Sequence, residues 1–188
     1  MEKIIRYGCI GAFIIAAMIA SIFLPRRELR TIAQVSGIAM DSKEGELNVS
    51  FEVFEPSVEQ PYGRERSIVK TQGKTLEECI DNARLSMGKV LYVDDAAVLI
   101  IGDKDLNILL QEIKRYYSEY KQDHMDLPII RVRNQMAAEV FEGKGKILST
   151  EIAESVRLMG KRSTIKDLLN GVEPDTFIKG VGRYEIIS

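Results

Sequence analysis

The sequence predicts an α+β fold (mixed α/β), in which helices pack on a mixed sheet behind one N-terminal transmembrane helix. Three observations support this prediction. Residues 7–24 carry no charge, residues 47–54 alternate between apolar and polar side chains, and residues 76–87 repeat apolar side chains at helical spacing. The chain of 188 residues is long enough for one domain and an anchor. We therefore expect a signal anchor at residues 1–27 and a folded domain at residues 28–188.

The first apolar segment has the length and flanks of a membrane anchor. Residues 7–24 approach the minimum needed to cross ~30 Å of hydrocarbon, and basic residues stand on both sides. A cleaved signal peptide is the alternative, but the run is longer than the usual apolar region and residues 20–21 lack an A-x-A cleavage pattern. We expect a single-pass anchor with the domain on the outer face of the membrane. The basic residues that follow the run weakly oppose this orientation.

The two side-chain periodicities predict the remaining elements in order. Strands are expected at residues 32–41, 47–54, 67–71, 90–92, 96–101 and 128–132. Helices are expected at residues 76–87, 106–120, 136–141, 150–159 and 165–169. Glycine-containing linkers separate them, and residues 96–101 are apolar without interruption, which is typical of a strand buried on both faces.

The helix expected at residues 76–87 has the clearest terminal signals. Thr75 and Glu78 have the spacing of a capping box, and Gly88 stands where a helix ends. Cys79 falls on the apolar face, where it reads as a small buried residue. Cys9 lies in the anchor, so the two cysteines predict neither a disulfide nor a metal site. In the next helix, Glu112 is expected on the solvent face.

Composition and motifs argue against several classes of function. The 26 basic and 28 acidic side chains leave no strongly basic surface for nucleic acid. His124 is the only histidine, so we expect a solvated link there rather than a catalytic triad or a histidine-rich metal site. GKGKI at residues 143–147 lacks the spacing of a phosphate-binding loop. Three tyrosines, Tyr116, Tyr117 and Tyr120, read as core and partly exposed helix surface.

The stretch LYVDDAAVLIIGD raises the question of an acidic site. A metal-dependent hydrolase would need Asp94, Asp95 and Asp103 to converge on one cation. Neighbouring strand residues point to opposite faces, and Asp103 lies about 26 Å from Asp95 along an extended chain. We therefore expect a turn, a buried strand and the start of a helix. No catalytic, cofactor-binding or metal-binding residue is assigned, and no cofactor is expected.

Two stretches carry a recognisable order of residues, RRELRTIAQVSGIAMDSKEGELNVSFEVFEP and GKTLEECIDNARLSMGKVLYVDDAAVLIIGD. The positions that define this order are Glu28 and Leu29; Gly37, Ile38 and Asp41; Pro56; Gly73 and Thr75; Lys89, Leu91 and Tyr92; Gly102 and Asp103. The order resembles the N-terminal domain of the Ger(x)C family of spore germination proteins. The resemblance runs clearly from Glu28 to Val132 and more faintly beyond.

The resemblance implies a non-catalytic protein of spore germination. Members of this family are C subunits of nutrient germinant receptors, held on the outer face of the spore's inner membrane beside two integral-membrane subunits. They are usually lipoproteins with a cysteine directly after the apolar run, where this chain has Pro25, Arg26 and Arg27. We expect the apolar helix to replace the lipid. Family members also continue into further domains, so the chain resembles the N-terminal domain alone.

Two functions from different classes follow. The first is a membrane-anchored component of germination that docks to germinant-receptor subunits. The alternative is a structural envelope protein whose exported domain associates with copies of itself. The mass of the domain in solution separates them, because only the second requires self-association.

Overall fold

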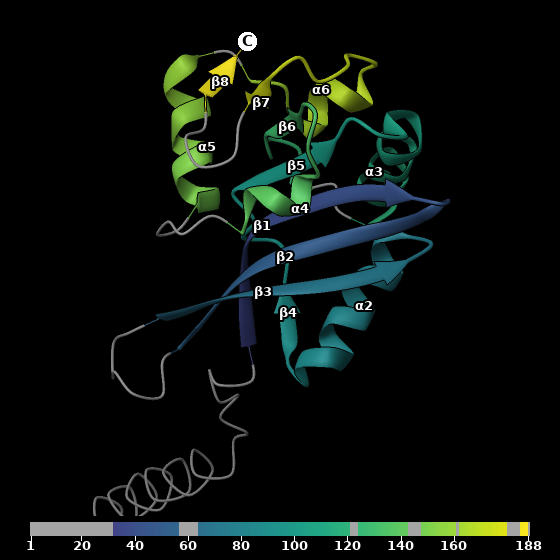
Figure 1. Cartoon of the computed structure of the whole chain (residues 1–188), viewed down its shortest axis with the longest axis vertical. Helices are drawn as coiled ribbons and strands as arrows, with labels where there is room; N and C mark the ends of the chain where they lie inside the picture. The colour runs from purple at the N-terminus through teal and green to yellow at the C-terminus, as the bar shows by residue number, and fades with distance from the viewer. Residues whose placement is uncertain are drawn as a thin grey trace, which may run out of the picture.

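The computed structural model describes residues 32–56, 64–120, 124–142, 148–160, 162–179 and 185–187 (Figure 1). The strands are β1 (Ile32–Lys43), β2 (Glu46–Pro56), β3 (Arg64–Gly73), β4 (Val90–Tyr92), β5 (Val98–Gly102), β6 (Ile129–Val132), β7 (Phe177–Lys179) and β8 (Glu185–Ile187). The helices are α2 (Leu76–Met87), α3 (Leu106–Tyr120), α4 (Ala137–Val140), α5 (Leu148–Met159) and α6 (Ile165–Leu169). The expected anchor lies outside these residues. Within them, no helix is long and apolar enough to cross a membrane.

The strands form one mixed sheet, as the sequence predicts. Their order is β3-β2-β1-β5-β6-β7-β8, and β4 lies beside the first part of β1. β1 pairs antiparallel with β2 and parallel with β4 and β5, so it joins an antiparallel half to a parallel half. The hairpin between β1 and β2 turns through Glu44 and Gly45, whose positive φ angles of 57° and 82° suit a tight two-residue turn.

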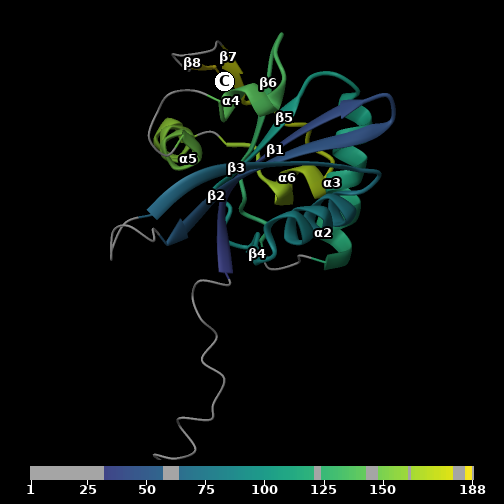
Figure 2. The same cartoon turned by 60° about the horizontal axis from the view of Figure 1, so that its bottom comes forward.

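Helices cover both faces of the sheet. α2, α3 and α6 share one apolar core with the sheet, and α4 and α5 share another on the opposite face (Figure 2). The side chains of β5 alternate between the two cores: Leu99 and Ile101 join the first, whereas Val98 and Ile100 join the second. All four are fully buried, which confirms the prediction of a strand covered on both faces.

A buried carboxylate links the two halves of this fold. The Glu52 side chain of β2 is fully buried, and it accepts hydrogen bonds from Arg66 Nε of β3 at 2.5 Å and from Ser36 Oγ of β1 at 2.8 Å. The backbone N–H of Ser149, in the first turn of α5, donates to the same carboxylate at 3.2 Å. Arg66 also donates to the carbonyl of Phe141 at 2.7 Å. One carboxylate therefore ties three strands to the segments that cover the second face.

The close approach of α5 to β1 depends on a glycine. Ser36 occupies a bulge, where the register between β1 and β2 shifts from Val35 to Gly37. A Cβ atom at Gly37 would lie 2.5 Å from the Ser149 Cβ, closer than two carbons can approach. Ser149 Oγ donates to Ser36 Oγ at 2.9 Å across this contact. Glycine at position 37 therefore lets the helix reach the bulge.

Several local expectations need correction. β3 begins at Arg64, three residues before the strand expected at residues 67–71, because a full ladder to β2 extends it. Glu78 does not complete the capping box at Thr75: its carboxylate accepts from the N–H of Lys74 at 2.8 Å, whereas the Thr75 side chain accepts from Glu78 N as expected. Glu112 is not on the solvent face, because it accepts from the first N–H of α2, that of Leu76, at 2.7 Å.

We predict that Glu52→Gln lowers the free energy of unfolding by about 3 kcal/mol, because Arg66 and Ser149 lose their charged acceptor in a buried site. Chemical denaturation of the full chain in mild detergent, followed by far-ultraviolet circular dichroism, measures this. Glu142→Gln is the matched control, since its carboxylate pairs with Lys70 at 2.5 Å with both side chains more than half exposed. Its cost should stay under about 1 kcal/mol. Equal costs for the two variants would contradict a central role for Glu52.

Candidate functional site

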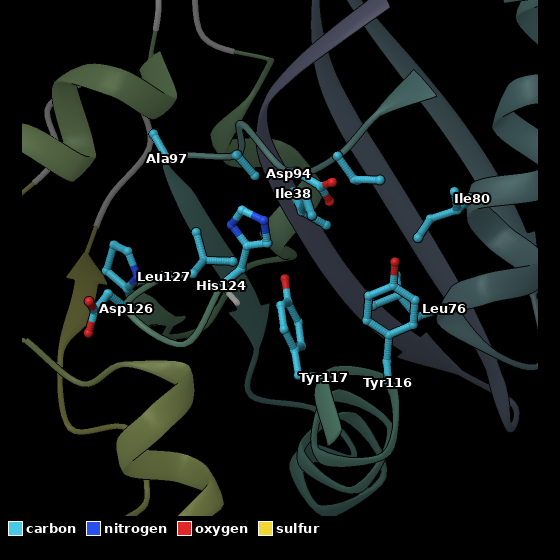
Figure 3. A pocket seen from close by; sticks show the side chains of 13 residues that line it. Ile38, Leu76, Ile80, Asp94, Ala97, Tyr116, Tyr117, His124, Asp126 and Leu127 are labelled. Atoms are coloured by element: carbon cyan, nitrogen blue, oxygen red, sulfur yellow. The ribbon is translucent and has the colours of Figure 1, made fainter. Parts of the chain in front are cut away.

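A pocket of about 280 Å³ lies between α2, α3 and the segments that lead into β5 and β6. Tyr116 and Tyr117 of α3 line it, together with apolar side chains of α2 and β1. Asp94 comes from the segment before β5, and His124 from the segment before β6. Figure 3 shows the two tyrosine hydroxyls pointing from α3 toward the side of the pocket that holds Asp94 and His124. We call this site the tyrosine pocket.

The tyrosine hydroxyls of this pocket stay protonated at neutral pH. Burial raises the pKa of Tyr116 to about 12, and the negative charge of Asp94 adds to the effect. Burial also raises the pKa of Tyr117, with further contributions from Tyr116 and Asp94. The two rings meet edge to face, with centroids 5.3 Å apart. Their hydroxyls therefore offer hydrogen bonds to a small molecule, and the described residues of the pocket's lining include no serine, cysteine or lysine to act as a nucleophile.

The three acids singled out in the sequence do not meet. Asp94 lines the tyrosine pocket, and Asp95 accepts a hydrogen bond from Gln34 Nε2 at 2.7 Å. Asp103 stands beyond the other end of β5, where it accepts from Arg131 Nη2 at 2.8 Å. Within the described ranges, no three His, Cys, Asp or Glu side chains are grouped so that they could hold a metal ion. The arrangement that a metal-dependent hydrolase would need is therefore not formed by these acids.

Other residues singled out in the sequence have mixed outcomes. His124 is not simply part of a solvated link, since it lines the tyrosine pocket and is only partly exposed. Tyr116 and Tyr117 are buried and Tyr120 is 50% exposed, which confirms the expectation of core and surface positions. Cys79 is fully buried, and burial raises its pKa to about 11, as expected for a small apolar residue. Residues 143–147 lie outside the described part of the chain.

A second pocket lies at the opposite end of the parallel strands. Its volume is about 740 Å³, and its walls come from the ends of β1 and β5 and from the segment between β6 and α4. Charged and amide side chains predominate: Asp41, Lys43, Asp103, Lys104, Asn134, Gln135 and Glu139. We call this site the strand-end pocket.

The floor of the strand-end pocket is held by Asp41. Its carboxylate, only 5% exposed, accepts hydrogen bonds from the N–H groups of Ala137 and Ala138 at 2.8 and 3.0 Å. A Cβ atom on Gly102 of the neighbouring strand would lie 2.4 Å from Asp41 Oδ1, so glycine leaves room for this contact. Asp41 therefore fixes the first residues of α4 against the ends of β1 and β5.

One of the comparisons with known proteins identifies a family. The family model described as spore germination protein N-terminal domain matches residues 25–175. The chain belongs to this family. No curated protein and no solved structure matched the chain. The resemblance inferred from the order of Gly37, Asp41, Thr75 and Gly102 is thereby confirmed.

Several residues of the order that identified the spore germination domain have a structural role in this fold. Gly37 has no side chain and so leaves space for α5, and Gly102 leaves space for the Asp41 carboxylate in the same way. Thr75 caps the N-terminus of α2. Lys89 forms an ion pair with Glu55 of β2. These contacts build the fold, and the contact between Gly102 and Asp41 also shapes the strand-end pocket. Sequence reasoning missed Glu52, whose hydrogen-bond partner Ser149 lies 97 residues away, and Lys104, Gln135 and Glu139 of the strand-end pocket, which come from separate segments of the chain.

We predict that Gly102→Ala destabilises the protein by about 1–3 kcal/mol, because the new methyl group meets the Asp41 carboxylate. A double-mutant cycle with Asp41→Ala, measured by chemical denaturation, isolates the contact. In the Asp41→Ala background the cost of Gly102→Ala should largely disappear. The same cost in both backgrounds would show that another contact is responsible.

The buried Asp41 also predicts a pH dependence. Burial raises its pKa above the ordinary value of 3.8, although the N–H groups of Ala137 and Ala138 pull it down. An acid with a raised pKa binds its proton more tightly in the folded state, so its contribution to stability is full below pH 3.8 and is lost as the pH rises through the folded pKa. The free energy of unfolding, taken relative to Asp41→Asn, should therefore fall as the pH rises above about 4. Denaturant titrations at several pH values measure it, and a difference that rises with pH would contradict it.

Proposed function

We propose that this chain is a membrane-anchored, non-catalytic component of spore germination that works by docking to the integral-membrane subunits of a germinant receptor. Membership of the spore germination family supports the role in germination. The separation of Asp94, Asp95 and Asp103 supports a function other than metal-dependent hydrolysis. The uncharged residues 7–24 support anchoring in the membrane. By resemblance to the family, we place the domain on the outer face of that membrane.

An exposed apolar patch is the observation that carries the docking proposal. Val90 and Tyr92 of β4 are 56% and 46% exposed, whereas Leu91 between them is buried in the first core. Strand pairing places Val90 opposite Ile32 of β1, so these side chains share the other face of the sheet. Phe54 of β2 pairs with the adjacent part of β1 on the same face and is half-buried. We call Ile32, Phe54, Val90 and Tyr92 the β4 patch.

The β4 patch stands near the place where the chain would leave the membrane. Only eight peptide units join Leu24, the last residue of the apolar run, to Ile32, and they span at most about 28 Å. β4 pairs with the very start of β1, so the patch belongs to the end of the sheet nearest the proposed anchor. An exposed apolar surface this close to the bilayer could contact an integral-membrane protein that projects from the same membrane.

We expect receptor subunits to co-purify with the tagged, full-length chain from detergent-solubilised spore membranes. Two glutamates in the patch, Val90→Glu with Tyr92→Glu, should reduce that recovery at least about tenfold, because a docked interface would bury both charges. Leu158→Glu is the matched control, since Leu158 is 75% exposed at the end of α5, away from β4. Circular dichroism establishes that each variant is folded.

Recovery of the wild-type chain with no receptor subunit, together with normal nutrient germination of a deletion strain, would refute the docking function. Recovery of a second, differently tagged copy of the chain in place of receptor subunits would instead favour the self-associating envelope protein. Equal loss of recovery in the patch variant and in Leu158→Glu would refute the assignment of docking to the β4 patch.

A further inference from the structure

The strand-end pocket lies where a sheet of this kind offers a natural binding crevice. β5 and β6 are parallel neighbours, but the chain after β5 passes to α3 on one face, whereas the chain after β6 passes to α4 on the other. The carboxyl ends of two such strands diverge into helices on opposite sides and leave a crevice between them. The pocket of about 740 Å³ is that crevice, and its size is within the range of small-molecule sites, roughly 300–1,000 Å³.

Some charged side chains of this pocket have hydrogen-bond or ion-pair partners within the protein, and others do not. Asp41 is satisfied by two backbone N–H groups, and Asp103 is neutralised by Arg131. In the part of the chain that the structure describes, no hydrogen bond or ion pair engages the side chain of Lys43, Lys104 or Glu139. Lys104 and Glu139 both lie close enough to act on the Asp41 carboxylate, the first lowering and the second raising its pKa. A cation and an anion therefore border the same crevice.

Two polar atoms of the pocket's residues are buried without a partner. They are Ser42 Oγ, on a residue that is 6% exposed, and Gln135 Nε2, which are two of the three such side-chain atoms among the described residues. A buried polar atom without a hydrogen bond costs about 1–3 kcal/mol, so it is seldom retained without a reason. Both residues belong to the lining of the strand-end pocket. A ligand with a hydrogen-bond acceptor would satisfy the amide N–H of Gln135.

We propose that the strand-end pocket binds a small zwitterion, a molecule with a carboxylate at one end and a protonated amine at the other. The carboxylate would accept from the Lys104 ammonium group and the Gln135 amide, and the amine would donate to Glu139. A simple anion would leave Glu139 facing negative charge, and a simple cation would leave Lys104 unmatched. At ~30 Å³ for each water molecule, the pocket has room for such a ligand with several ordered waters.

This site is independent of the proposed docking surface. The β4 patch includes Ile32 at the start of β1, whereas Lys43 of the strand-end pocket stands at the end of β1, eleven residues later and about 36 Å away at ~3.3 Å per residue. Loss of ligand binding and loss of docking are therefore separable results. Neither depends on the other.

Calorimetric titration of the full-length chain in detergent with each of the common free amino acids tests the proposal. At least one of these zwitterions should bind, whereas acetate and ethylamine, which carry one charge each, should bind at least about tenfold more weakly. Lys104→Gln and Glu139→Gln should each weaken the binding at least about tenfold, because each removes one charge-assisted contact.

Lys74→Gln and Glu77→Gln, at exposed positions before and within α2, are the matched controls and should leave the binding unchanged. Circular dichroism shows whether each variant keeps its fold. Binding of no amino acid up to about 10 mM would overturn the proposal. The proposal would also be overturned if acetate bound as tightly as the amino acids. It would likewise be overturned if Lys104→Gln and Glu139→Gln both left the binding unchanged.

Discussion

Glu52 places a carboxylate on β2, the second strand from one edge of the sheet, at a position with no exposed surface. A charge there is tolerated only when hydrogen bonds and an opposite charge surround it. Arg66, Ser36 and the N–H of Ser149 supply them, and each comes from a different element. The contact of α5 with the sheet therefore satisfies a buried group, in addition to the apolar core that α4 and α5 share with the sheet and the contact of Asp41 with α4. The first layer, in contrast, is held mainly by apolar packing.

β1 is the element through which both halves of the fold are built. It pairs with an antiparallel strand on one side and with two parallel strands on the other, and its bulge at Ser36 sits beside Glu52. The bulge turns a polar side chain toward the buried carboxylate, and the next residue, Gly37, leaves the space that α5 enters. A regular strand with a larger residue here would keep the ladder and lose the helix contact. The bulge at Ser36 and the glycine that follows it are thus required for α5 to pack against the sheet.

The sequence predicts those parts of the fold that depend on neighbouring residues. The alternation of β2, the apolar stripe of α2 and the glycine at its end each have a local cause, and the structure confirms all three. Glu52 and Glu112 show the limit. Both stand among polar residues that periodicity assigns to solvent, yet one meets Ser149, 97 residues away, and the other caps a helix 36 residues away. Contacts with distant residues determine where the side chains of Glu52 and Glu112 lie, and the local sequence pattern does not reveal those contacts.

Local sequence patterns do not reveal which distant residues meet in the fold. For this reason the strand-end pocket could not be predicted from the sequence, whereas the family could be recognised. Gly37, Asp41, Thr75 and Gly102 have places in the recognisable order because the backbone needs them there. Lys104, Gln135 and Glu139 border the pocket, and among the described residues their side chains make no hydrogen bond to a strand, a turn or a helix end. A scaffold fixed by one set of residues can therefore carry a binding crevice whose chemistry is set by another. Changes in the second set alter what is bound and leave the sheet, with its Glu52 network, intact.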